Sequence, residues 1–246
     1  MEQTRRDSMG PKNNKQIPSL QSEFRTELIL TPDAIRRASG IKINGRRYKS
    51  FLFSSDVATI MYTDADAVLA VYPYTPHPSI IKALSIVAPA PLAAGVGGGV
   101  TQGPRSGVIA KFADAYGCMA VVLNAAADVE TVRIVKEAID IPIIYTVISD
   151  FQELDAHIEA GASILNISGG KDTTKIVKHV RETYPDIAII ATGGKKDEDI
   201  IATIQAGANA ITYTPPTTQA VFQKNMEKYR EELLDDYETK NTKIDE

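Results

Sequence analysis

The chain has few of the residues that form disulfides or metal sites. Its 246 residues contain one cysteine, three histidines and no tryptophan, and aromatic residues make up 7% of the total. The single cysteine, Cys118, excludes an intrachain disulfide, and we expect it in the core. His157 and His179 fall within predicted helices and are expected at the surface. With so few soft ligands, scattered along the chain, we expect no metal site.

Long apolar runs and an excess of positive charge are also absent. No apolar run approaches the ~20 residues that span a membrane. A net charge of −4 and a pI near 5.5 argue against a general binder of nucleic acid or of anionic membranes. The first residues, MEQTRRDSMGPKNNKQ, lack the apolar core of a secretory signal. We therefore expect a cytoplasmic protein with neither kind of partner, and a homo-oligomer is compatible with the sequence.

The feature that the chain does have is a regular alternation of strand-like and helix-like segments. Apolar strand-like runs begin near residues 49, 67, 92, 118, 142, 163, 187 and 209. Such a spacing, about 23 residues, holds one short strand, one helix and two loops. Eight such units predict a single (β/α)₈ TIM barrel, an α/β fold, and an open doubly wound sheet is the alternative.

The segment before the first strand is predicted to cover the bottom of the barrel. Thr31 is expected to cap a short helix that ends near Ser39. The pair Asn44-Gly45 predicts a hairpin. Because both precede the first strand, they should lie at the N-terminal end of the barrel strands. The expected organisation is a disordered or loosely docked segment, this cap, the barrel and a tail, at residues 1–20, 21–48, 49–238 and 239–246.

Two glycine pairs stand where a predicted strand leads into a helix. Gly193-Gly194 precedes Lys195, and Gly169-Gly170 precedes Lys171. Backbone N–H groups at such turns can bind an anion, and the phosphate site of this fold often lies near its seventh and eighth strands. Glycine pairs also occur in plain turns, so an anion site and turn geometry remain alternatives.

The stretch ATGGKKDEDIIATIQAGANAITY resembles the seventh-to-eighth-strand signature of the phosphate-binding, aldolase-type TIM-barrel superfamily. This group includes ribulose-phosphate-type epimerases, indole-glycerol-phosphate-type synthases and flavin mononucleotide (FMN) oxidoreductases. The resemblance implies that Gly193 and Gly194 present amides to a phosphate. The usual Gly-Ser or Gly-Thr after the last strand is replaced by Thr214-Pro215-Pro216, and prolines donate no N–H, so hydroxyls such as that of Thr214 would substitute. Residues from about 16 to 213 also resemble a bacterial barrel family labelled hydrolase.

Four residues near the C-terminal strand ends are candidate catalytic groups. Asp56 could be a general base, although Ser-Ser-Asp before a helix is also a plain N-cap. His77 is the one histidine on the expected catalytic rim. Asn124 ends an apolar strand and suits either a substrate contact or a core hydrogen bond. Lys171 could form a Schiff base or neutralise a phosphate.

Together these features predict an enzyme that acts on a small phosphorylated metabolite by lyase or isomerase chemistry, through an enediolate-like intermediate. Asp56 or His77 would move the proton, and Lys171 or Lys195 would neutralise the phosphate. No cofactor is expected in this interpretation. The alternatives are an FMN-dependent oxidoreductase, a hydrolase of undefined substrate and a non-catalytic metabolite-binding barrel. The glycines expected to bind phosphate are Gly169, Gly170, Gly193 and Gly194.

Overall fold

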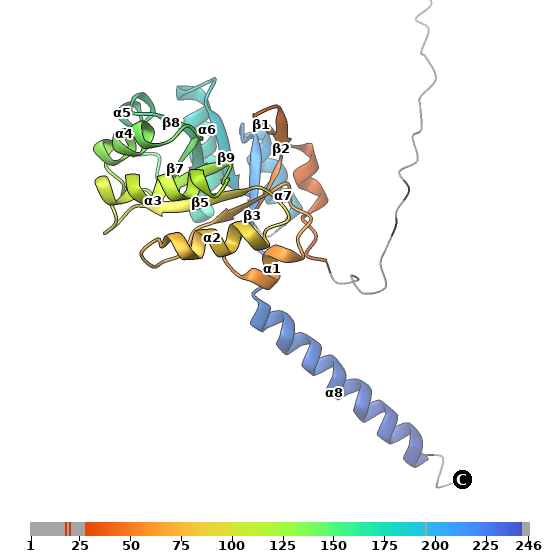
Figure 1. Cartoon of the computed structure of the whole chain (residues 1–246). Coiled ribbons are helices and arrows are strands. Elements are labelled where there is room, and N and C mark those ends of the chain that lie inside the picture. Colours follow the sequence, from red (N-terminus) through yellow and green to blue (C-terminus); the bar gives the residue numbers. More distant parts are fainter. Residues whose placement is uncertain (1–17, 19, 21–27, 195, 243–246) are drawn as a thin grey trace, which may run out of the picture.

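The computed structural model describes residues 18, 20, 28–194 and 196–242, and its backbone forms a closed barrel from which one helix projects (Figure 1). Most of the expected N-terminal segment, the end of the expected tail and Lys195 lie outside the described residues.

Eight parallel strands close the barrel in sequence order, and the last strand pairs with the first, with Thr212 opposite Phe51. This closure confirms the (β/α)₈ prediction over the open sheet, and each predicted strand start is confirmed to within two residues. The strands are β3 (Ser50–Phe53), β4 (Ala67–Ala70), β5 (Leu92–Gly97), β6 (Ala120–Leu123), β7 (Ile143–Val147), β8 (Ala162–Ile167), β9 (Ala188–Thr192) and β10 (Ala210–Tyr213).

Helices connect consecutive strands and surround the barrel (Figure 1). Their starts follow from side-chain caps such as Asp128, which accepts a hydrogen bond from the N–H of Thr131 at 2.8 Å. The connecting helices are α1 (Val57–Met61), α2 (Pro78–Val87), α3 (Pro104–Ala115), α4 (Val129–Ala138), α5 (Asp155–Glu159), α6 (Thr173–Thr183) with a preceding 3₁₀ turn η2 (Gly170–Asp172), and α7 (Asp197–Gln205).

The core has two layers because side chains alternate along every strand. In β3, Phe51 points into the barrel and Leu52 points outward to the helices, and both are fully buried. Strands covered on both faces read as continuous apolar runs, which explains why they could be found in the sequence. Cys118 is buried, as expected.

A hairpin closes the N-terminal end of the barrel. Strands β1 (Ile41–Ile43) and β2 (Arg46–Tyr48) pair antiparallel, and Asn44 and Gly45 between them both have positive φ. Ile41, Ile43 and Tyr48 are buried in the same cluster as Phe51. Just before β1, the N–H of Gly40 donates to the carbonyl of Asn209, which precedes β10. These contacts confirm the predicted position of the hairpin.

The predicted helix from Thr31 to about Ser39 is wrong in extent and in its cap. The structure has a five-residue 3₁₀ helix, η1 (Asp33–Arg37), which Pro32 precedes and extended backbone at Ala38 ends. The N–H of Thr31 donates to Asp64 Oδ1 at 2.7 Å instead, so a neighbouring loop holds this residue. η1 packs against α7 in the outer layer, with Ile35 only 2% exposed.

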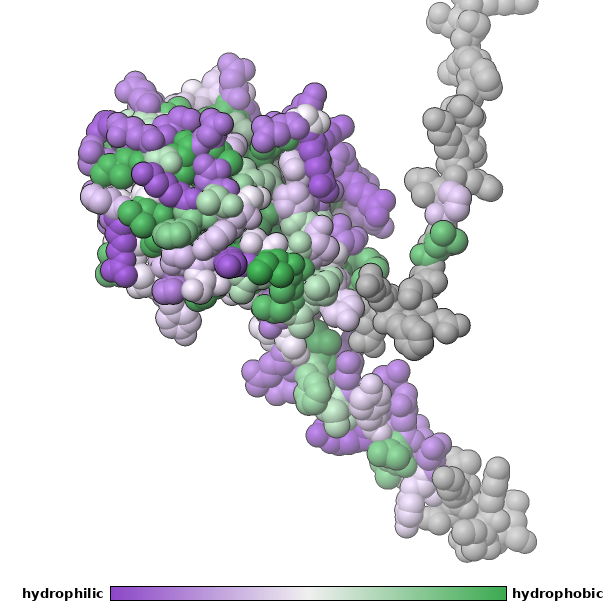
Figure 2. All heavy atoms as spheres, in the orientation of Figure 1, coloured by the Kyte–Doolittle hydropathy of each residue, from purple (hydrophilic) through white to green (hydrophobic). Residues whose placement is uncertain are grey.

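The last helix, α8 (Thr218–Thr242), leaves the barrel near α1 and extends away from it (Figure 1). A hydrogen-bond contact of 3.2 Å between the hydroxyls of Thr59 and Thr218 joins its first turn to α1. Apolar atoms gather on the visible face where α8 meets α1 (Figure 2). No helix among the described residues is long and apolar enough to cross a membrane.

Candidate functional site

Short neutral polar side chains face inward at the C-terminal mouth of the barrel. Two residues deeper on each of the same strands, the inward position is apolar and belongs to the interior cluster. Because side chains alternate, the later positions also point inward. We call this set the polar ring. It consists of Asn124, which directly follows β6, and of Thr146, Asn166, Thr192 and Thr212, which belong to β7 to β10 in order.

Two buried atoms of the polar ring have no hydrogen-bond partner among the described residues. They are Asn166 Oδ1 and Thr212 Oγ1, on side chains from β8 and β10 that are 8% and 6% exposed. Asn166 Nδ2 lies 3.5 Å from Thr146 Oγ1, a long hydrogen bond. Leaving a buried polar atom unpaired costs about 1–3 kcal/mol, so a bound polar group here would recover free energy.

Two cavities open at the mouth and share Asn124 and Ala126. The first, of about 530 Å³, lies between the loops that follow β4 and β5. The second, of about 640 Å³, is lined by Thr146 and by loop residues after β7, among them Ile148 and Gln152. Both volumes fall within the range of small-molecule sites.

The glycine-rich loop after β5 forms one wall of the first cavity. The N–H of Gly98 donates to the carbonyl of Thr101 at 2.8 Å, and a Cβ at Gly98 would lie 2.5 Å from Cβ of Asn124. Gly98 also has a φ of +118°, so glycine is required there on both counts. The backbone therefore approaches Asn124 closely and fixes its position at the mouth.

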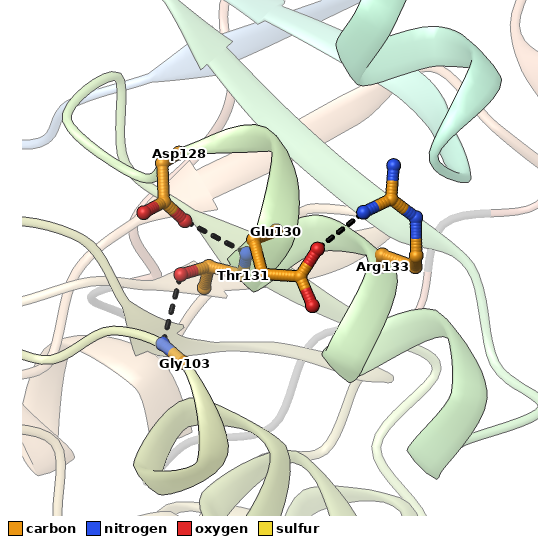
Figure 3. A network of polar contacts seen from close by, with 5 residues as sticks. All are labelled: Gly103, Asp128, Glu130, Thr131 and Arg133. Atoms are coloured by element: carbon orange, nitrogen blue, oxygen red, sulfur yellow. Dashed lines mark hydrogen bonds and ion pairs between the residues drawn. The ribbon is translucent and has the colours of Figure 1, made fainter.

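Helix α4 anchors the end of this loop (Figure 3). The hydroxyl of fully buried Thr131 accepts a hydrogen bond from the N–H of Gly103 at 2.8 Å. Asp128 caps the same turn, and hydrogen bonds from the Thr131 side chain and backbone lower the pKa of its carboxyl. Glu130 and Arg133 form an exposed ion pair beside it (Figure 3). The first cavity thus has a rigid wall.

Asp56 caps α1. Its Oδ1 accepts a hydrogen bond from the N–H of Thr59 at 2.7 Å, and this bond is the main cause that lowers the pKa of the carboxyl. The N-cap alternative is therefore confirmed. A carboxylate with a lowered pKa is a weak base, so this environment does not prepare Asp56 for proton abstraction.

His77 caps α2 through its ring. Nδ1 accepts a hydrogen bond from the N–H of Ser79 at 3.2 Å, which in the neutral ring leaves the proton on Nε2. The backbone N–H of His77 donates to the hydroxyl of Tyr72, and Tyr72 and Pro76 both line the first cavity. His77 is therefore exposed at the edge of that cavity.

The loop after β8 lies beside the second cavity. The N–H of Gly169 donates to the Thr173 hydroxyl at 3.1 Å, and a Cβ at Gly169 would lie 2.2 Å from Ile176 Cδ1 of α6, so close packing requires this glycine. The carbonyl of Ile148, which lines the cavity, would lie 3.5 Å from that Cβ. Gly170 has a φ of +61°, and Lys171 is exposed in η2. Helix α6 begins here with Asp172 at its N-cap, whose side chain makes no capping hydrogen bond, and with no acidic residue in its first turn.

The loop after β9 has the same glycine pair in a different environment. A Cβ at Gly193 would lie 2.6 Å from Ile211 Cγ2, so close packing of helix and strand requires this glycine. Gly194 has a φ of +80°, and a Cβ there would lie 3.1 Å from the carboxylate oxygen Asp199 Oδ2. The first turn of α7 also contains Asp197 and Glu198. Its carboxylates complement the helix dipole but make this loop less suited to an anion than the loop after β8.

The structure brings together only part of the predicted site. Asn124 joins the polar ring and lines both mouth cavities. Asp56, His77 and Lys171 line neither cavity, and Thr214 is exposed after β10. Thr146, Asn166, Thr192 and Thr212 end predicted strands, so their position in the sequence makes them site candidates, and the structure brings them together at the mouth.

A second group supports the second cavity from behind. The hydroxyl of Tyr145 donates to the carbonyl of Ala125 at 3.0 Å and accepts from Gln152 Nε2 at 3.2 Å. Burial raises the pKa of Tyr145. The prediction that His157 is a surface residue is wrong, because its ring stacks on Tyr145 at 4.4 Å and its Nε2 lies 3.2 Å from the carbonyl of Ala127.

A larger hollow, of about 770 Å³, lies at the opposite end of the barrel beside the hairpin. Its most prominent polar group is Arg181, which donates to the carbonyls of Pro185 and Gly207 and to Asn209 Oδ1. This guanidinium is already used to join chain segments. Active sites of this fold lie at the C-terminal strand ends, and the unpaired atoms of Asn166 and Thr212 are also at that end, although neither residue lines a mouth cavity.

No protein-family model and no curated protein sequence matches the chain. Solved structures match its fold. A phosphonopyruvate hydrolase complex with oxalate and Mg²⁺ has a TM-score of 0.58 at 13% identity, over 77% of this chain and 83% of that one. An aldolase named QR15 has a TM-score of 0.53 at 17% identity, and the match covers 68% of this chain and 88% of that one. A mandelate oxidase mutant with a monooxide FMN adduct has a TM-score of 0.55 at 14% identity, and the match covers 72% of this chain and 68% of that one.

These likenesses confirm the expected (β/α)₈ barrel fold. The Mg²⁺ of the phosphonopyruvate hydrolase complex does not fit the described mouth of this chain. Mg²⁺ prefers carboxylate oxygens, whereas the polar ring offers amides and hydroxyls. Within the described part of the chain, no group of three or more His, Cys, Asp or Glu residues is placed to hold a metal ion.

Proposed function

We propose that the protein is an enzyme that acts on a small phosphorylated metabolite at the C-terminal mouth of the barrel. The observation that carries the proposal is the pair of unpaired buried atoms, Asn166 Oδ1 and Thr212 Oγ1, that face the barrel interior. Evolved interiors rarely retain such atoms without a partner. A substrate with hydroxyl groups would satisfy both.

The proposed reaction is a lyase or isomerase step with an enediolate-like intermediate. The amides of Asn124 and Asn166 would donate hydrogen bonds to the oxygen on which negative charge develops, and a preorganised donor of this kind commonly supplies ~3 kcal/mol. His77 would move the proton through Nε2, because its Nδ1 is engaged in capping α2. In this scheme Asp56 only caps the N-terminus of α1 and takes no part in the proton transfer.

The phosphate would bind at the loop after β8, through the N–H of Gly170 and the ammonium of Lys171, beside Gly169, whose own N–H donates to the Thr173 hydroxyl. The start of α6 has no side-chain cap, which favours an anion there, and the charge of Lys171 would offset that of the N-cap residue Asp172. The residues around β9 and β10 remain the alternative phosphate site, and they are Gly193, Gly194, Lys195 and Thr214.

Thermal-shift titration with inorganic phosphate and a panel of phosphosugars tests the proposal. The same panel, assayed for turnover, separates an enzyme from a metabolite-binding barrel without catalysis. Lys171→Ala should weaken phosphate binding about tenfold, which corresponds to the ~1.4 kcal/mol of one charge-assisted hydrogen bond. Lys178→Ala removes the same charge from exposed α6 and should leave binding unchanged. Equal affinities of the two variants would place the phosphate elsewhere.

FMN-dependent oxidoreduction is a second candidate, favoured by the absence of charged side chains from the polar ring. When bound, FMN supplies the electron-transfer chemistry that neutral side chains cannot. Asn124 and Thr146 would contact its ring, and the loop after β8 would hold its phosphate. A yellow purified protein, or one whose melting temperature rises more with FMN than with any phosphosugar, would favour this candidate. A colourless protein whose melting temperature does not change with FMN would eliminate it.

A further inference from the structure

The projecting helix α8 has an apolar face that nothing in the described chain covers. Phe222, Met226, Tyr229, Leu233 and Tyr237 recur at intervals of four or three residues and therefore line one side of the helix. Four of them, all but Met226, are between 51% and 69% exposed. We call these five residues the α8 stripe. Monomeric proteins rarely expose so long an apolar surface.

Other segments occupy part of the barrel wall near the start of α8. In this fold the helix after the last strand belongs to the outer ring of helices. Here η1 packs against α7, and the segment around Ile29 packs beside α1, where the N–H of Ile29 donates to the carbonyl of Tyr62 at 2.7 Å. Ile35 of η1 is almost fully buried. The helix instead projects from the barrel for roughly 37 Å, at 1.5 Å per residue (Figure 1).

The charges of α8 are divided along its length. Its first half contains Lys224, Lys228 and Arg230, with Glu227 as the single acidic residue. Its second half contains five acidic residues and one basic residue, Lys240; the acidic residues are Glu231, Glu232, Asp235, Asp236 and Glu238. Two copies of the helix in antiparallel orientation place the basic half of each beside the acidic half of the other. A parallel pair would place like charges together, which is unfavourable. The occupant that matches this helix is therefore a second copy of it.

The spacing of the α8 stripe is also self-complementary. With a two-fold axis near Tyr229 and Arg230, Met226 of one copy meets Leu233 of the other, and Phe222 meets Tyr237. Lys228, which lies 3.5 Å from Glu232 of its own helix, is then level with Glu231 of the second copy. This is the isologous arrangement of a symmetric dimer, in which each contact occurs twice.

An apolar groove at the base of α8 extends the same surface. It has a volume of about 440 Å³ and lies between α1, the segment around Ile29 and the first turns of α8. Leu28, Leu30, Tyr62 and Phe222 line it, and all four are more than 40% exposed. The antiparallel register brings Tyr237 of the second copy to Phe222, at the edge of this groove.

We propose that α8 is a dimerisation element, through which two copies of this chain pair antiparallel along the α8 stripe. The end of each helix covers the groove at the base of the other. The two barrels then lie at opposite ends of a two-helix rod. Both mouths remain open, because the groove is lined by none of the residues of the mouth cavities.

Sedimentation equilibrium over a range of concentrations gives the first test. The parent protein should have twice the 26.7 kDa mass of the chain. Leu233→Glu, which places a charge in the centre of the stripe, should give the monomer mass with an unchanged melting temperature of the barrel. Ala220→Glu adds the same charge away from the stripe and should remain dimeric. A parent protein that is monomeric throughout, or a dimeric Leu233→Glu, would overturn the proposal.

Cysteine cross-linking tests the orientation and does not depend on the charge variants. Cys118 is buried and its pKa is raised to about 11, so it will not compete under mild oxidation. A mixture of Met226→Cys and Leu233→Cys chains, one of them tagged, should form the mixed disulfide, because the two Cβ atoms must come within about 4.5 Å. Each variant alone should not cross-link. Self-cross-linking of either variant would indicate a parallel pair, and no mixed disulfide would rule out this register.

Discussion

The two ends of the barrel are built from the same strands but satisfy their polar groups differently. At the N-terminal end, Asn209 is fully used, since its Oδ1 accepts from Arg181 and from the N–H of Ile189 while its Nδ2 donates to Ser39. At the C-terminal mouth, Asn166 Oδ1 is buried and unpaired within the described chain. Closure of one end stabilises the fold, and the other end retains polar atoms for a ligand.

The two inward-facing aromatic residues of β3 should show the largest difference. Phe51 is fully buried and its ring lies 6.3 Å from that of Tyr48 in the hairpin, whereas Phe53 is 38% exposed at the mouth. Phe51→Ala should lower the free energy of unfolding by about 3–5 kcal/mol, because it leaves a cavity in a closed core. Phe53→Ala should cost much less. Chemical denaturation measures both, and equal losses would show that the mouth is as tightly packed as the bottom.

Replacing Asn209 and Asn166 by leucine tests whether the two ends of the barrel differ in how much their buried amides stabilise the fold. Asn209→Leu should cost about 2 kcal/mol, since it leaves the N–H of Ile189 without its acceptor and removes one of the acceptors of the Arg181 guanidinium. Asn166→Leu should leave the stability of the ligand-free protein unchanged or higher, because an unpaired carbonyl oxygen is removed. The same Asn166→Leu variant should lose the phosphosugar stabilisation proposed above. A strong destabilisation by Asn166→Leu would mean that this amide belongs to the structural network.

The smallest expected effect concerns Asp56, a charged residue near the mouth that serves the fold. Asp56→Ala should cost about 1 kcal/mol at neutral pH, the usual value of an N-cap. Because the pKa of Asp56 is lowered in the folded protein, its contribution is complete above its usual value of 3.8 and is lost as pH falls through the lowered value. The difference in the free energy of unfolding between the parent and Asp56→Ala should therefore disappear at acidic pH. Asp56→Asn keeps a capping oxygen, so full activity of that variant would confirm a structural role, and its loss would make Asp56 catalytic.

Helix caps and turns could be predicted from the sequence because their causes are local. Asn44-Gly45 makes its hairpin through positive φ at adjacent residues, and Asp56 caps α1 three residues from its donor. The 3₁₀ helix η1 was predicted as a longer helix because Thr31, the expected cap, is held by Asp64, which lies 33 residues further on. The position of His157 was predicted wrongly for a similar reason. Its ring stacks on Tyr145, which belongs to a neighbouring strand, and the sequence of the helix does not show that contact.

By itself the sequence determined the barrel. Eight apolar runs separated by helices predict parallel strands that are buried on both faces, either in a closed barrel or in an open sheet, and their even spacing favours closure. The tertiary structure decided which polar residues meet. The sequence places each member of the polar ring at the end of a strand, but only the shared register of β6 to β10 brings these ends together and leaves two of the side chains without a partner. It also separated two identical glycine pairs, because the carboxylate near Gly194 comes from α7 while the loop at Gly170 leads into an uncapped helix.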